Sequence, residues 1–270
     1  MVRRVVGFGL GLMLLAGGTT ELRAQDEAFE WRGRLSQGQT VEVRGISGNI
    51  TAELASGSTV EIIATKHGRR GDFDDVTIEI YEGRDGVTVC AIYGSWNQGD
   101  EGCDGRDRRR ERRRSIDVSV DFEVRVPAGV EFVGSMVSGD VEARDLESDV
   151  RATTVSGDVF VSTTEVAWGT TVSGSIDIEM GSSDWDDLHF STVSGDITLL
   201  LPEDLDADID FESLSGDFHS DFALDLESRR NRWVGSHVRG TIGDGGRRLS
   251  FNTISGDVRL RRTRARSQAR

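Results

Sequence analysis

The phrase Ser-Gly-Asp, with an apolar residue on each side, recurs along this chain and limits its fold more than any other feature. Complete copies are centred on Gly139, Gly157, Gly195, Gly216 and Gly256. Near copies at Gly48 and Gly174 replace the aspartate by Asn49 and Ser175. From Gly139 to Gly216 the copies lie 17 to 21 residues apart. A short regular period predicts a repeat architecture in which each unit stacks on the next.

The flanks of the phrase repeat as well, because apolar residues tend to fall seven, five and two positions before the glycine and two and four after it. Around Gly256 these residues are Leu249, Phe251, Ile254, Val258 and Leu260. Steps of two are typical of strands with alternate side chains facing a core, whereas the step of three indicates a bend suited to glycine. Short Ser and Asp side chains can hydrogen-bond the turn backbone. We therefore predict that each phrase is a corner between two short strands, with a degenerate eighth copy at Gly240.

About 20 residues suffice for one coil of two or three short strands, so we predict an all-β solenoid over about residues 130–262. In such a stack the corners align in a column. An antiparallel β-sandwich stays open as the alternative fold, because a period does not fix strand order. The 33 glycines and 2 prolines favour short strands and turns over helices.

Residues 29–126 hold further strand signals, in short alternating runs at 60–62, 76–80, 87–90 and 116–126. Because a copy of the corner also occurs at Gly48, we expect one continuous domain over residues 25–262, with a long loop at about 94–114. The basic segment 263–270 is predicted to be a disordered tail.

The first 24 residues are typical of a secretory signal peptide. Arg3 and Arg4 precede an apolar run from Val5 to Ala16, and small residues end near Ala24. No cysteine directly follows this run and no second apolar stretch occurs, so we expect neither a lipid anchor nor a membrane span in the mature chain. The predicted location is the periplasm or the cell surface.

Cys90 and Cys103 are the only cysteines of the chain. In an exported protein, two cysteines 13 positions apart favour a disulfide over a zinc site, which would need further ligands nearby. We predict that they form a disulfide.

The chain carries a formal charge of −15, which becomes −17 without residues 1–24, since these hold three arginines and one glutamate. Such a surface repels nucleic acid, and no nucleic-acid partner is expected. One segment is locally basic, with arginines at 106, 108, 109, 110, 112, 113 and 114. We interpret it as a solvated loop, or alternatively as an anion-binding patch formed by Arg108, Arg109, Arg110, Arg112, Arg113 and Arg114.

With its Ser-Gly-Asp corners, the Val-Pro-Ala-Gly run from Val126 to Gly129 and its export signal, the chain resembles the "putative adhesin" family of bacterial exported domains over roughly residues 40–262. The resemblance implies a repetitive β-solenoid-like fold and roles in adhesion and envelope stress, in a family largely of unknown function. It implies no catalytic residues.

No common catalytic motif is present in the sequence. The four histidines show no mutual ligand spacing, and His219, between Asp217 and Asp221, comes nearest to a site. Stacked corner aspartates could cap turns or, alternatively, bind calcium weakly. We expect no catalytic residue, metal or cofactor. Exposed aromatic residues that could bind sugar or peptide are Trp96, Trp168, Trp185 and Trp233.

Strong structural repetition without catalytic groups favours a noncatalytic exported module that binds an unidentified envelope polymer or protein. The alternative is a polysaccharide lyase or hydrolase, because parallel β-helices also carry enzymes that act on acidic sugars. Such enzymes need paired acids or a basic group beside calcium, which the repeats do not obviously supply.

Overall fold

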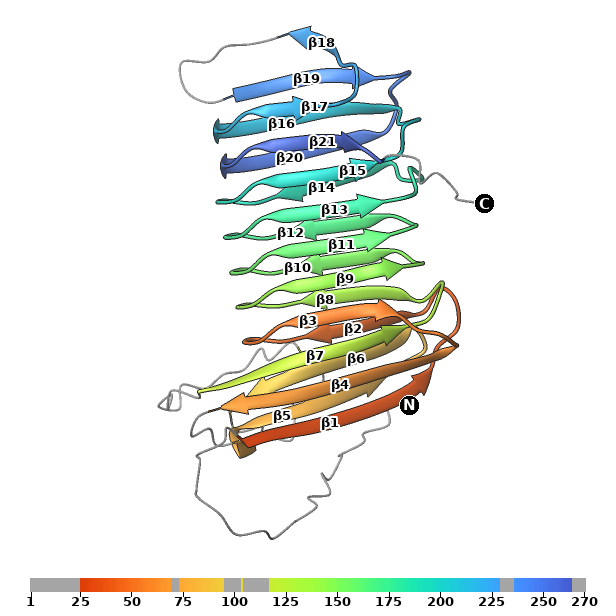
Figure 1. Cartoon of the computed structure of the whole chain (residues 1–270), viewed down its shortest axis with the longest axis vertical. Helices are drawn as coiled ribbons and strands as arrows, with labels where there is room; N and C mark the ends of the chain where they lie inside the picture. Colours follow the sequence, from red (N-terminus) through yellow and green to blue (C-terminus); the bar gives the residue numbers. More distant parts are fainter. Residues whose placement is uncertain (1–24, 69–72, 95–102, 104–116, 229–235, 264–270) are drawn as a thin grey trace, which may run out of the picture.

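The structure, a computed structural model, describes residues 25–68, 73–94, 103, 117–228 and 236–263. Within these residues the chain is almost entirely β-strand, with one short 3-10 turn, η1 (Phe73–Asp75). The strands form two long sheets that lie face to face and run the length of the molecule (Figure 1). The core lies between the two sheets.

Neighbouring strands of each sheet come from successive coils. The first sheet, here sheet A, has the order β1 (Gln25–Arg34), β4 (Thr59–Gly68), β7 (Val118–Val126), β3 (Ile50–Leu54), β9 (Val141–Leu146), β11 (Val159–Thr163), β13 (Ile176–Met180), β15 (Ile197–Leu201), β21 (Val258–Arg262) and β17 (Phe218–Ser220). Sheet B has the order β18 (Asp225–Ser228), β19 (Ser236–Ile242), β16 (Ala207–Ser215), β20 (Arg248–Ser255), β14 (Asp187–Ser191), β12 (Ala167–Thr170), β10 (Val150–Thr153), β8 (Glu131–Ser135), β2 (Thr40–Arg44), β6 (Gly86–Tyr93) and β5 (Val76–Glu82).

Each regular coil consists of one strand in sheet B, a Ser-Gly-Asp corner and one strand in sheet A. Successive coils pair in parallel and in register, as β10 does with β12 and β11 with β13. Antiparallel pairs occur toward the two ends of the stack, among β1, β4 and β7, between β5 and β6, and among β16, β18 and β19. The predicted β-solenoid is therefore confirmed, with two strands in each regular coil, and the sandwich alternative is excluded by the parallel pairing.

Two coils near the end of the stack do not follow chain order. The coil formed by β20 and β21 lies between the coil of β14 and β15 and the coil of β16 and β17 (Figure 1). The chain therefore builds the outer coil first and then returns, through β18 and β19, to fill the position beneath it. A simple progression of coils along the sequence does not describe this end.

The core consists of the inward-facing residues of both sheets. In the coil of β10 and β11, Val150, Ala152, Val159 and Val161 are each at most 1% exposed. Toward the later coils the position five before the glycine is filled by Phe190, Phe251 and Phe211, and the first two rings stack 5.9 Å apart. Burying one such ring contributes roughly 2–3 kcal/mol, so the aromatic column is a main source of stability at this end.

The structure differs from the sequence pattern of the repeat in two respects. The position two before the glycine faces solvent, because the inward alternation continues by one more step of two, to the residue three before the glycine. That residue is a buried threonine in the central coils, as at Thr154 and Thr171. The eighth corner at Gly240 does not exist, since Gly240 lies inside β19 and pairs with Ile209 of β16.

Candidate functional site

The Ser-Gly-Asp corners form a continuous column along one edge of the stack. The amide of each corner glycine except Gly216, the last in the column, donates to the carbonyl of the corner serine in the next coil, as from Gly157 to Ser173 at 3.0 Å. A Cβ on Gly157, at φ +154°, would lie 2.1 Å from the carbonyl oxygen of Gly139. Glycine is therefore needed both for its backbone conformation and for the close approach of neighbouring coils. The glycines of this column are Gly48, Gly139, Gly157, Gly174, Gly195, Gly256 and Gly216.

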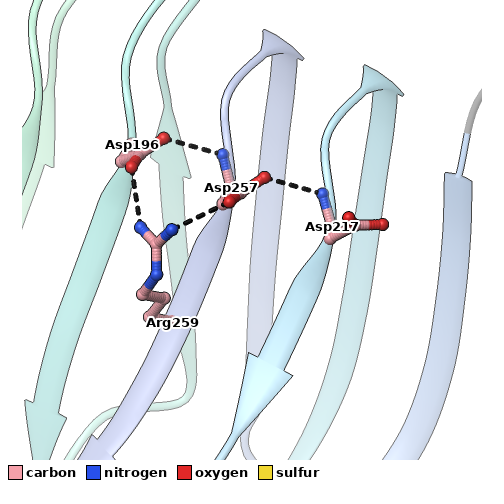
Figure 2. A network of polar contacts seen from close by, with 4 residues as sticks. All are labelled: Asp196, Asp217, Asp257 and Arg259. Atoms are coloured by element: carbon pink, nitrogen blue, oxygen red, sulfur yellow. Dashed lines mark hydrogen bonds and ion pairs between the residues drawn. The ribbon is translucent and has the colours of Figure 1, made fainter.

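The corner aspartates bind backbone amides of neighbouring coils. Asp196 Oδ1 accepts from the amide of Asp257 at 2.9 Å, and Asp257 Oδ1 accepts from the amide of Asp217 at 3.0 Å (Figure 2). Arg259 bridges the other oxygens of Asp196 and Asp257, at 2.7 and 2.8 Å. The amide of Asp257, and then Arg259, hold the pKa of Asp196 below its usual range. The carboxylates of Asp196 and Asp257 thus each join one coil to the next. The sequence suggested instead that a corner aspartate bonds the backbone of its own turn.

Beside this column runs a stripe of exposed aliphatic side chains, here called the aliphatic row. Its members occupy the position two before the corner glycine and are 43–56% exposed. In spatial order they are Val137, Val155, Val172, Val193, Ile254 and Leu214. At about 4.8 Å between coils, they form one continuous apolar surface on the outside of the molecule.

An open depression of about 410 Å³ lies on the outer face of sheet B. It is lined by Arg151, Ala152, Thr153, Trp168, Thr170, Asp187 and His189, which come from β10, β12 and β14. The guanidinium carbon of Arg151 lies 5.1 Å from the centre of the Trp168 ring. The depression therefore combines a partly exposed indole with an arginine, an imidazole, a carboxylate and two hydroxyls.

The sheet is irregular at this depression, where strands β12 and β14 share one registered pair, Thr170 with Ser191. By contrast, β14 and β20 share five pairs. The segment 181–186 between β13 and β14 lengthens this coil, and Trp185 from that segment is buried. The longer connection thus coincides with the place where the sheet opens.

A third group of side chains lies farther along the outer face of sheet B. Asp210 and Glu212 of β16 and His237 of β19 each offer one ligand atom, and these atoms all lie within 4.8 Å of one another. His237 Nε2 is 3.3 Å from Asp210 Oδ1, and Nδ1 is 3.6 Å from Glu212 Oε1. The antiparallel pairing of β16 with β19 brings these residues together across 25 to 27 positions of sequence.

Comparison with known proteins places most of the stack in a family. Residues 135–261 match the family model described as Toastrack DUF4097. This segment is a Toastrack DUF4097 domain. The resemblance to an adhesin-like family inferred from the sequence is thereby confirmed for this segment. The Toastrack domain contains the depression, the whole aliphatic row and the group of Asp210, Glu212 and His237.

A search of curated proteins found no match to the chain that contains this Toastrack domain. Solved structures with similarity include a "putative cell adhesion protein" from Clostridium sporogenes, with 8% identity, a TM-score of 0.44, and coverage of 88% of this chain and 100% of that one. A "putative adhesin" from Bacteroides fragilis has 12% identity, a TM-score of 0.37, and coverage of 87% and 97%. A "putative lipid binding protein" from Parabacteroides distasonis has 12% identity, a TM-score of 0.28, and coverage of 88% and 97%.

The other residues predicted from the sequence lie outside the Toastrack domain or away from its groups. Cys90 of β6 and Cys103 form a disulfide, with their Cα atoms 6.0 Å apart. The arginines from Arg108 to Arg114, Trp96 and Trp233 lie outside the described residues. His219 lies on β17, on the other sheet from His237. No helix among the described residues has the length and apolar character needed to cross a bilayer.

Sequence reasoning missed Asp210, Glu212 and His237 as a group. The alternation along β16 indicates that the two acids share a face, but the glycine pattern predicts a corner at Gly240, which lies inside β19. Without the strand assignment, nothing in the sequence places His237 opposite Glu212.

Proposed function

We propose that this chain is a noncatalytic exported module of the bacterial envelope or cell surface, which binds an envelope polymer or protein along one edge of its stiff stack. The aliphatic row is the observation that supports this function. The cross-coil hydrogen bonds of the corner column supply the stiffness. The partner meets a surface whose spacing is fixed by the coils beneath it.

The fold does not require an apolar side chain at the positions of the row. Each member is more than two-fifths exposed, whereas the residues that fill the core on either side of the corner are buried. Isolated exposed aliphatic residues are ordinary, but a contiguous apolar patch on a soluble domain marks an interaction surface. We therefore assign the row to partner binding.

The depression around Trp168 supports a polysaccharide as the partner. An indole ring can stack against the apolar C–H face of a sugar ring, and the flanking Arg, Asp, His and Thr side chains can hydrogen-bond its hydroxyls. The depression lies on the outer face of sheet B, whereas the aliphatic row lies at the corner edge. A partner bound to the row therefore leaves the depression accessible. One polymer chain could thus contact both surfaces.

The test replaces Val155, Val172 and Val193 together by threonine, which keeps the β-branched shape and removes the apolar character. Binding of the purified chain to bacterial envelope preparations should weaken at least tenfold. Phe160→Thr is the matched control, because Phe160 is an exposed apolar residue of β11 outside the row. Equal binding by the triple variant and the wild type would refute a role for the row.

A polysaccharide panel tests the second surface and the noncatalytic assignment together. Trp168→Ala should lose binding to any polysaccharide that the wild type retains, while the fold is unchanged by circular dichroism. Release of reducing ends or unsaturated products by the wild type would establish the lyase or hydrolase alternative instead. A variant without the arginines from Arg108 to Arg114 tests whether that segment adds an anion-binding contact.

A further inference from the structure

We infer that Asp210, Glu212 and His237 form a zinc-binding site on the outer face of sheet B, near the end of the stack. The set offers two carboxylates and one imidazole, which are common zinc ligands. The imidazole nitrogen favours zinc over calcium, which prefers an all-oxygen site with more ligands. This inference does not depend on the proposed binding function.

The strand pairing holds the three side chains on one face. Asp210 and Glu212 are two residues apart on β16, so they point to the same side of the sheet. In the antiparallel register His237 of β19 lies directly opposite Glu212, and Arg239 lies opposite Asp210. Both ligand-bearing strands belong to regular sheet structure, which fixes the positions of their side chains.

Two atoms of the group face each other, shielded from solvent, without forming a hydrogen bond. Asp210 Oδ1 and His237 Nε2 are both shielded from solvent, and neither makes a hydrogen bond. They lie 3.3 Å apart. Two ligands on a tetrahedral zinc ion, each about 2.1 Å from the metal, are separated by roughly 3.4 Å. The observed separation therefore matches a pair of atoms that share one metal ion.

The groups around Asp210 Oδ1 and His237 Nε2 leave both atoms available to bind a metal ion. Arg239 donates to Asp210 Oδ2 from Nε at 3.2 Å and from Nη2 at 3.0 Å, which orients the carboxylate and leaves Oδ1 toward His237. Such partners of ligating carboxylates are a regular part of metal sites. The Glu212 side chain is 60% exposed, so it has room to turn toward the metal as the third ligand. Water would complete the tetrahedral coordination.

The experiment is isothermal titration of the chain from Gln25, purified without a polyhistidine tag, with zinc chloride and separately with calcium chloride. We expect one zinc ion per chain and a higher melting temperature in zinc, because an ion bound to the folded state stabilises it. His237→Gln and Asp210→Asn should each weaken zinc binding at least tenfold. The matched control is His219→Gln, which removes a histidine flanked in sequence by two aspartates and should bind zinc like the wild type.

Each outcome decides the inference. Absence of zinc binding by the wild type would overturn it and leave His237 as an ion-pair partner of the two carboxylates. Undiminished binding by His237→Gln would overturn it as well, because the ion would then lie elsewhere. Melting curves of the variants without zinc, equal to that of the wild type, would show that the loss comes from the ligand and not from unfolding.

Discussion

The threonine three positions before the corner glycine is buried in three consecutive coils, although it is polar. Thr154, Thr171 and Thr192 each donate a hydroxyl hydrogen bond to a glycine carbonyl of the preceding coil, at 2.9 to 3.2 Å. A buried hydroxyl without such a partner is costly. The residues at this position in the two coils that break chain order, Thr253 and Ser213, lack a partner for their buried hydroxyl oxygens. Polar residues three positions before the glycine thus complete the core, whereas the aliphatic residues two positions before the glycine lie outside it.

Asp177 of β13 is a residue whose charge opposes folding. Burial raises its pKa above the usual 3.8, a hydrogen bond from Thr198 acts against this, and the charges of Asp158 and Asp196 add to the rise. A carboxyl group whose pKa is higher in the folded state destabilises the fold above that pKa, and its effect disappears at pH values below 3.8.

We therefore expect Asp177→Asn to stabilise the chain at pH 7, by less than about 1 kcal/mol because the carboxyl group is only partly buried and solvent screens its charge. The gain over the wild type should vanish at pH 3. Urea unfolding at both pH values measures it. Glu179→Gln, an equal charge change on the same face of the same strand, is the control. A gain that persists at pH 3 would contradict the assigned cause.

At the scale of elements, the corners and most strands could be predicted from the sequence, because their residues repeat and alternate. The strictly alternating run that ends at Val126 is β7, with one buried and one wet face. The outward direction of the aliphatic row could not be predicted, because a polar threonine occupies the neighbouring inward position, where an apolar residue would be expected. The depression and the group of Asp210, Glu212 and His237 depend on the pairing of strands far apart in the chain, which local patterns do not encode.

The corner glycine sets how closely the backbones of two neighbouring coils can approach each other. In Gly157→Ala, the added Cβ would lie 2.1 Å from the Gly139 carbonyl oxygen, in a backbone conformation unfavourable to alanine. We expect a loss of roughly 2–4 kcal/mol in the free energy of unfolding. Gly57→Ala, where no heavy atom lies within 4 Å of the added Cβ, should change it by less than about 0.5 kcal/mol. Thermal or urea unfolding compares the two, and equal stabilities would show that the stack adjusts at its corners.

At the scale of the whole molecule, the order of the coils makes the later strands structurally central. Strands β20 and β21 separate β14 and β15 from β16 and β17 in both sheets. A chain that ends at Gly243 lacks both strands, so β16 and β17 lose the neighbour that connects them to the rest of the stack.

We expect this truncation to abolish protease protection of residues 207–220 and to lower the melting temperature by more than 10 °C, since the lost contacts exceed a few kcal/mol. A chain that ends at Thr263 keeps every described strand and should melt like the full chain. Limited proteolysis followed by mass spectrometry locates the protected region. Protection of residues 207–220 in the shorter chain would show that the outer coil folds on its own.

Because synthesis proceeds from the N-terminus, the polypeptide that fills the gap beneath the outer coil is among the last to emerge. Until then, β14 and β15 on one side and β16 and β17 on the other present unpaired strand edges, which other chains can join. A prematurely terminated product therefore keeps such edges exposed and is open to degradation, whereas a full-length product covers them. The insertion of β20 and β21 makes native assembly contingent on completion of the chain.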